Sequence, residues 1–301
     1  MTRFRSSLIA GARTATFAAT FAATFAATFA ATFATQAHAQ VAVTPGTAAT
    51  AKADTIKKAE QPLFTLSDAA LAVGFTGLTF ALYPVDKSMA ERLQNQNSLL
   101  SKSIDKWATG FDYLTLPGVF VLGVGTYAFG RITKQVNVTD VAWHATEAVL
   151  VGSILTEVIK VSAGRSRPFV TSDTNPRDFK LGTGFANDAR SSFPSGHATI
   201  AFAAAAAVTS EVHRLWPRYA VATGALVYGS AVAVALARMY QNQHWASDVV
   251  VGAGIGTFAG LKTVRYSHLH PDNMVDRLIL HTNIAPDGRG GARLSWSMPI
   301  R

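Results

Sequence analysis

A series of long apolar segments is the feature that most constrains how this chain folds. Several of them carry about 18 uncharged residues, the length that spans the hydrocarbon core of a bilayer. Only 15% of all residues are charged, against roughly 25% in an average soluble domain. We therefore predict an all-α fold, a membrane-embedded bundle of six helices, over residues 65–84, 113–130, 140–162, 197–211, 218–237 and 246–263.

The first 39 residues have the features of an export signal. Three arginines precede an uncharged stretch of Ala, Thr and Phe, which closes on Ala37-His38-Ala39, a small-x-small cleavage pattern. We expect a signal peptide over residues 1–39 and a mature chain in a bacterial cell envelope. Residues 40–64, rich in Ala, Thr and Lys, are predicted to form a flexible leader.

The carboxyl-terminal residues differ from the apolar segments that precede them. One helical domain is expected over residues 65–265, and residues 266–301 form a separate tail. Within this tail a Gly-rich turn at 287–291 precedes alternating apolar positions at Leu294, Trp296 and Met298. Alternation after a turn predicts a short β-hairpin, to which no chemistry is assigned.

Basic residues in the short connections predict which ends of the helices face the cytoplasm, because cytoplasmic loops collect Lys and Arg. Connections 163–196 and 238–248 then face the periplasm. A cleaved signal conflicts with this, since six spans from an outer terminus would turn these connections inward. We expect helix 65–84 to lie on the surface without crossing; an unused signal or a soluble domain are the alternatives. The basic residues are Arg131, Lys134, Arg214, Arg218, Lys262 and Arg265.

The overall composition narrows the chemistry that the chain can perform. It has no cysteine, which excludes disulfides, thiolate metal sites and cysteine nucleophiles. Its formal net charge of +9 falls to +6 without the three arginines of the expected signal, and a mildly basic mature chain suits an anionic substrate or a membrane surface. We identify no nucleic-acid-binding motif, and no protein partner can be inferred.

The first of three polar clusters is KVSAGRSRPF, in which Lys160 and Arg167 lie seven positions apart and Pro168 ends any helix. Taken alone, basic residues at a helix end are typical of contacts with the helix dipole or with lipid headgroups.

The second cluster is SSFPSGHAT, in which Ser195, Gly196 and His197 lie at the start of an Ala-rich helix. Backbone amides at a helix amino terminus can hold a phosphate, and His197 could then protonate a leaving oxygen. The alternative is an ordinary helix cap made by Ser195.

The third cluster is ARMYQNQHWASD, with His244 and Asp248 four positions apart. On one helical turn the carboxylate could accept from one ring nitrogen and leave the other as a nucleophile. The alternative is a capping Asp beside an interfacial His. Together with the cations Lys160, Arg167 and Arg238, the clusters supply what phosphoryl transfer needs without a metal.

In order and spacing, these clusters resemble the signature of the type 2 phosphatidic acid phosphatase family, whose relatives include class A acid phosphatases and vanadium haloperoxidases. The matching positions are Lys160-x6-Arg167-Pro168, then Pro194-Ser195-Gly196-His197, then Arg238-x5-His244-x3-Asp248. One departure is Ala237, where the family usually has Ser, which affects local hydrogen bonding more than catalysis.

The resemblance implies catalytic roles for three residues. His244 would attack phosphorus to give a phosphohistidine, Asp248 would orient His244, and His197 would protonate the leaving alkoxide. The phosphate would be bound by Lys160, Arg167, Arg238, Ser195 and the amide of Gly196, and no cofactor is implied.

A metal site is not expected from the remaining acids and histidines. His144 and Glu147 are three apart in one apolar segment, but metal ligation in a bundle would need partners from other helices. We expect a buried hydrogen bond there instead. Glu157, on the same segment as Lys160, is expected to help position that lysine.

These observations predict a metal-independent phosphatase in the inner membrane, with its active site facing the periplasm. A lipid phosphate is the expected substrate: phosphatidic acid, phosphatidylglycerol phosphate, an isoprenyl pyrophosphate or a lipid A phosphate. The alternatives are a soluble periplasmic acid phosphatase, a vanadate-dependent haloperoxidase and a lipid-binding or transport protein with a degenerate site.

Overall fold

The computed structural model describes most of the chain that follows the expected leader. The signal peptide over residues 1–39 and all but the end of the leader at 40–64 lie outside the described residues. The described residues are 62–94, 110, 118–170, 175–184, 187–280, 282–286 and 292–296.

The chain divides into two compact units, Met1–Gly74 and Phe75–Arg301. In the first unit, helix α2 (Leu66–Leu82) begins and continues past the division. Asp68 fixes this beginning, because its carboxylate accepts hydrogen bonds from the Thr65 amide at 2.6 Å and the Thr65 hydroxyl at 2.9 Å. A carboxylate in the first helical turn also suits the helix dipole.

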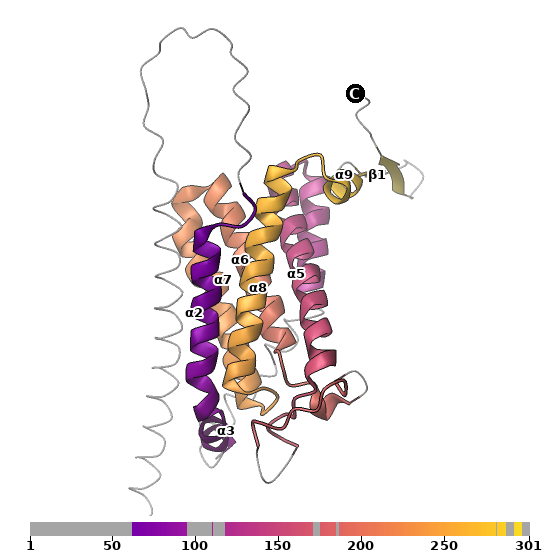
Figure 1. Ribbon diagram of the computed structural model, residues 1–301. Helices are drawn as coiled ribbons and strands as arrows, with labels where there is room; N and C mark the ends of the chain where they lie inside the picture. The colour runs from indigo at the N-terminus through magenta and orange to yellow at the C-terminus, as the bar shows by residue number, and fades with distance from the viewer. Residues whose placement is uncertain are drawn as a thin grey trace, which may run out of the picture. The chain divides into compact units, whose positions relative to one another are not determined.

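The core of the second unit consists of three helices that pack on one another, α5 (Val136–Ala163), α6 (Gly196–Leu215) and α8 (Ala246–Leu269). Helix α7 (Pro217–Tyr240) packs mainly on α6 (Figure 1). The carboxyl end of α5 meets the amino ends of α6 and α8, so α5 runs antiparallel to the other two. Small apolar side chains fill the space between the three helices, including Ala148, Val149, Ile200, Ala203, Ala207 and Ala259.

Glycines allow α8 to approach α6 closely. A Cβ on Gly256 would lie 2.3 Å from the carbonyl oxygen of Thr199, and one on Gly260 would lie 2.6 Å from that of Ala203. Spacing of small residues by four places them on one helix face. The face of α8 that carries Gly252, Gly256 and Gly260 is therefore a helix-packing surface.

Two described helical stretches are long and apolar enough to cross a membrane, judged by length and composition: Leu66–Leu93 and Pro217–Tyr240. A shorter apolar helix covers Gly118–Ile132, and the remainder of the expected 113–130 helix lies outside the described residues. Helices α5, α6 and α8 are long but do not meet this criterion in the described structure.

The structure adds two α-helices to the six expected from the sequence, so the six-helix count was incomplete. Helix α3 (Asp86–Gln94) follows the short 3-10 helix η1 (Tyr83–Val85), and α9 (Met274–Leu280) lies in the expected tail. Both are short, which makes their apolar periodicity hard to recognise. A second 3-10 helix, η2 (Asp188–Arg190), precedes α6.

The end of α8 differs from the sequence expectation, and two strands lie in the expected tail. Helix α8 ends at Leu269, beyond the expected domain boundary at 265, because no helix-breaking residue occurs before Pro271. Strands β1 (Thr282–Pro286) and β2 (Ala292–Trp296) pair antiparallel, from Thr282 opposite Trp296 to Pro286 opposite Ala292. The predicted turn at 287–291 lies outside the described residues.

The close approach of α8 to α6 predicts that Gly256→Ala destabilises the protein by roughly 1–3 kcal/mol, the usual cost of overpacking. Gly229→Ala in α7 is the matched control, since a Cβ there meets nothing within 4 Å and alanine favours a helix. Thermal unfolding of both variants in detergent measures the difference. Equal unfolding temperatures would contradict the close packing.

Candidate active site

The eight residues singled out in the sequence lie where the carboxyl ends of α5 and α7 meet the amino ends of α6 and α8. The beginnings of α6 and α8 are tied together, because the Ser195 amide donates to the Asp248 carbonyl at 3.1 Å. Gly252 permits this contact, since a Cβ there would lie 2.4 Å from the Ser195 carbonyl oxygen.

Lys160 lies in the last turn of α5 and reaches the start of α6. Its Nζ is 2.6 Å from Glu157 Oε1, as expected, and 3.4 Å from the position that a Cβ on Gly196 would occupy. Helix α5 ends after Lys160 because Gly164 adopts a left-handed conformation, with φ of 59°. A Cβ at Gly164 would lie 1.9 Å from the Lys180 carbonyl oxygen, so glycine is required there.

Arg167 is held in the connection between α5 and α6 by several acceptors. Its Nε donates to the Asp188 carbonyl at 2.9 Å, and one terminal nitrogen contacts Asp188 Oδ1 at 2.7 Å and Ser191 Oγ at 2.8 Å. The other terminal nitrogen donates to Gln243 Oε1. Since Gln243 directly precedes His244, this contact places the Arg167 guanidinium beside the third cluster.

The second cluster forms the first turn of α6. Ser195 is the N-cap residue, and its buried hydroxyl accepts from the Ala198 amide at 3.4 Å. Gly196 and His197 are the first two helical residues, and both are half-buried. The capping role considered for Ser195 is therefore confirmed, and it fixes the helix end that carries His197.

His244 lies in the connection between α7 and α8, with only 4% of its surface exposed. Its Nδ1 is 2.6 Å from the carbonyl oxygen of Ser192. Because a carbonyl oxygen can only accept, Nδ1 carries the proton in this contact, and a neutral ring then has its lone pair on Nε2. Burial lowers the pKa of His244 well below its ordinary value, and the nearby charges of Arg167 and Arg238 lower it further. The neutral, nucleophilic form is therefore favoured.

The structure corrects the expected contact between Asp248 and His244. Helix α8 begins only at Ala246, with Trp245 as N-cap, so His244 precedes the helix and does not share a helical turn with Asp248. The Asp248 carboxylate instead accepts from the Trp245 amide at 2.9 Å and the Ser192 hydroxyl at 2.5 Å. Asp248 thus contacts both neighbours of His244: Ser192, whose carbonyl accepts from the His244 ring, and Trp245, which follows His244 in the chain.

Arg165 is a buried residue of this region that the sequence reading did not single out. Only 1% of its surface is exposed, and its guanidinium lies between two fully buried carboxylates. One terminal nitrogen contacts Asp248 Oδ1 and also Ser247 Oγ at 2.8 Å; the other contacts Asp86 Oδ2 at 2.8 Å. Asp86 also accepts from the Ser247 amide at 3.0 Å. Arg165 therefore links α3 to the start of α8.

The sequence carried only a partial signal for this network. Arg165 is two residues before Arg167 in the same cluster, and a charged residue among apolar segments needs a partner. The guanidinium carbon of Arg165 also lies over two aromatic rings. It is 5.3 Å from the centre of the Tyr83 ring and 5.1 Å from the centre of the Phe179 ring. Its acidic partner Asp86 lies 79 positions away, and no local pattern identifies it.

Ala237 and Arg238 lie in the last turn of α7. Arg238 is buried, with 8% exposed surface, and donates to Gln241 Oε1 at 2.8 Å. Ala237, which departs from the family pattern, is 7% exposed and packs with Tyr240 and Leu93. Its side chain therefore occupies an apolar contact between α7 and α3.

A known protein family matches the part of the chain that carries the three clusters. Residues 141–271, which include all three clusters, match the model of the PAP2 superfamily. Over this segment the chain resembles the PAP2 superfamily. The matched segment contains α6, α7 and α8 together with most of α5, and hence the helix ends that carry the clusters.

Three proteins illustrate what this chain is similar to. The lipid A 1-phosphatase of Porphyromonas gingivalis is 40% identical over 72 residues, which are 24% of this chain and 15% of that relative. A transmembrane PAP2-type phosphatidylglycerolphosphate phosphatase from Bacillus subtilis is 18% identical, with a TM-score of 0.49 over 67% of this chain and 96% of the other. LpxE of Aquifex aeolicus is 24% identical, with a TM-score of 0.43 over 60% and 94%.

The Arg165 network predicts a large loss of stability on replacement of Arg165. Arg165→Met leaves the buried carboxylates of Asp86 and Asp248 without their cation, which costs about 3–5 kcal/mol. Arg190→Met is the matched control, because its partner Asp178 is 36% exposed and exposed pairs contribute about 1 kcal/mol or less. Chemical denaturation in detergent compares the two. Similar losses for both would show that the buried network is not a structural link.

Proposed function

We propose that this protein is a phosphatase that hydrolyses a lipid phosphate through a phosphohistidine on His244. The observation that carries the proposal is the contact between His244 Nδ1 and the Ser192 carbonyl. A nucleophilic imidazole needs an unprotonated nitrogen with a fixed direction, and this contact supplies both.

The charges around His244 suit a phosphoryl group. Arg167 and Arg238 are close enough to His244 to lower its pKa, and the side chain of Lys160 reaches the start of α6. Three cations can neutralise the phosphoryl oxygens as charge develops in the transition state. The amino terminus of α6 adds its dipole and amides, including that of Gly196. This set of groups supports phosphoryl transfer without a metal ion at the phosphate.

The reaction proceeds in two displacements. In the first, His244 Nε2 forms a bond to phosphorus as the bond to the ester oxygen breaks, and His197 gives a proton to the departing alkoxide. In the second, His197 takes a proton from water, whose oxygen attacks phosphorus and breaks the P–N bond. Inorganic phosphate leaves, and both histidines return to their starting states. Asp248 acts through Ser192 by holding the carbonyl that orients His244.

Two observations support a lipid as the substrate. The half of α5 that leads to Lys160 exposes an apolar face, formed by Leu150, Val151, Ile154, Leu155, Val158 and Ile159, and two helical stretches are apolar enough to cross a membrane. The similar proteins named above are called lipid A or phosphatidylglycerolphosphate phosphatases. We propose an inner-membrane protein in which the eight site residues, here called the phosphate cluster, face the periplasm together with the polar connections 163–196 and 238–248. The phosphate cluster consists of Lys160, Arg167, Ser195, Gly196, His197, Arg238, His244 and Asp248.

Phosphate release from a panel of substrates tests this function. The panel contains phosphatidic acid, phosphatidylglycerol phosphate, an isoprenyl pyrophosphate, a lipid A phosphate and a soluble aryl phosphate, with the full chain in detergent. We expect release from at least one lipid, and we expect His244→Ala to reduce kcat by about 10⁴-fold or more, as for other nucleophile deletions. The matched control is His213→Ala on α6, which we expect to retain activity.

Other outcomes would contradict parts of the proposal. Release from the aryl phosphate but from no lipid would indicate an acid phosphatase of broad specificity. Halide oxidation after vanadate loading, without phosphate release, would indicate a haloperoxidase. Lipid binding that persists in His244→Ala, with no turnover by either protein, would indicate a lipid-binding protein.

A further inference from the structure

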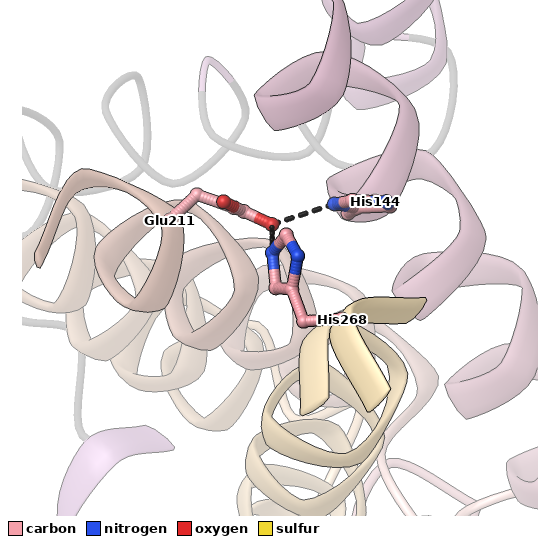
Figure 2. A group of neighbouring side chains, drawn as sticks. All are labelled: His144, Glu211 and His268. Atoms are coloured by element: carbon pink, nitrogen blue, oxygen red, sulfur yellow. Dashed lines mark hydrogen bonds and ion pairs between the residues drawn. The ribbon is translucent and has the colours of Figure 1, made fainter. Parts of the chain in front are cut away.

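Another group of polar side chains, distinct from the three sequence clusters, lies at the end of the helical core opposite the phosphate cluster. His144 lies in α5, Glu211 in the last turns of α6 and His268 in the last turn of α8 (Figure 2). His144 precedes Lys160 by 16 positions on one helix, which corresponds to about 24 Å of helical rise. The two clusters are therefore separate sites.

The two histidine rings converge on a single oxygen atom of Glu211. Glu211 Oε1 is 2.6 Å from His144 Nδ1 and 2.7 Å from His268 Nε2, and Figure 2 shows both rings directed at it. The three potential ligand atoms all lie within 4.8 Å of one another. Glu211 is fully buried and His144 is 3% exposed, whereas 32% of the His268 side chain is exposed. The group therefore has one side open to solvent.

The second nitrogen of His144 faces another acid. Its Nε2 is 3.8 Å from Asp276 Oδ2, and Asp276 is itself fixed by Trp143 Nε1 at 2.8 Å. If His144 Nδ1 donates a proton to Glu211, Nε2 must either direct a lone pair toward Asp276 or hold a second proton, which places a buried cation there. If Nδ1 instead binds a metal ion, a neutral ring carries its proton on Nε2, directed toward Asp276. A carboxylate behind a histidine ligand is the usual outer partner in metal sites.

The charge balance also favours a cation. Four carboxylates interact electrostatically in this region, those of Asp140, Glu147, Glu211 and Asp276. Arg214 contacts the second oxygen of Glu211 at 2.9 Å, and the two histidines supply positive charge only when protonated. Glu147 Oε2 is buried without a hydrogen-bond partner among the described residues. A dication would supply positive charge beside these acids while leaving both histidines neutral.

We propose that His144, Glu211 and His268 bind a divalent transition-metal ion, with Zn²⁺ as the best-suited class. Two imidazole nitrogens and one carboxylate oxygen form a ligand set that Zn²⁺ takes in proteins, and water on the exposed side of His268 completes a tetrahedron. The ion joins α5, α6 and α8 at the end of the core that lacks the Arg165 network. No metal site was expected from the sequence, because only His144 and Glu147 lie close together in it. The structure adds Glu211 from α6 and His268 from α8.

Metal content and thermal stability of the full chain in detergent test this site. After equilibration with micromolar Zn²⁺ and removal of free metal, we expect about one Zn²⁺ per chain in the wild type and a higher unfolding temperature than in the chelated protein. His268→Ala is the primary variant, since its partly exposed side chain can be removed with little packing loss. We expect it to weaken Zn²⁺ binding by at least tenfold and to abolish the stabilisation. Asp276→Asn is expected to weaken binding by about 10–100-fold, the usual effect of losing an outer partner.

Controls separate this site from adventitious binding and from the phosphate cluster. His213→Ala removes a histidine of α6 that lies outside the ligand group, and it should bind Zn²⁺ like the wild type. Absorption of the Co²⁺-loaded wild type should show tetrahedral d–d bands that His268→Ala lacks. Equal Zn²⁺ binding by wild type and His268→Ala, or no binding by the wild type, would overturn the proposal and indicate a cluster held together by protons alone.

Discussion

The buried guanidinium of Arg165 is the interaction on which the geometry of the phosphate cluster depends. It lies between the carboxylates of Asp86 and Asp248, and all three residues are at most 1% exposed. Isolated buried charges are strongly unfavourable, so each of these groups requires the others in place. The network fixes α3, the connection after α5 and the first turn of α8 relative to one another, and the remaining contacts of the cluster build on these positions.

From this network a short chain of contacts leads to the proposed nucleophile. Arg165 contacts Asp248, Asp248 accepts from the Ser192 hydroxyl, and the Ser192 carbonyl contacts His244 Nδ1. Each step fixes the direction of the next group, which is how precise positioning is achieved for a reacting atom. Asp248, the acid that the family pattern associates with the histidine, therefore has no direct contact with the His244 ring in this chain of contacts; Ser192 lies between them.

The sequence predicted the parts of the site that depend on short spacing, because short spacing fixes local geometry. Ser195 at a helix start and Lys160 at a helix end were recognisable from neighbouring residues alone. The contact between His244 and the Ser192 carbonyl was not recognisable. A separation of four positions places two residues on one helical turn only when both are helical, and α8 begins after His244. Asp86, Glu211 and His268 could not be assigned either. Their contacts with Arg165, His144 and each other join positions 57 to 79 apart, and only the packed helices bring these positions together.

The most direct test of the central claim is the identification of the atom that receives the phosphoryl group. The chain is mixed with a ³²P-labelled lipid phosphate that it turns over, quenched within milliseconds in alkali, digested, and the labelled peptide is sequenced by mass spectrometry. We predict an alkali-stable, acid-labile phosphohistidine at His244, formed and lost at rates that match turnover. Turnover with label on no residue, or with label on His197 instead of His244, would contradict nucleophilic attack by the imidazole that Ser192 holds.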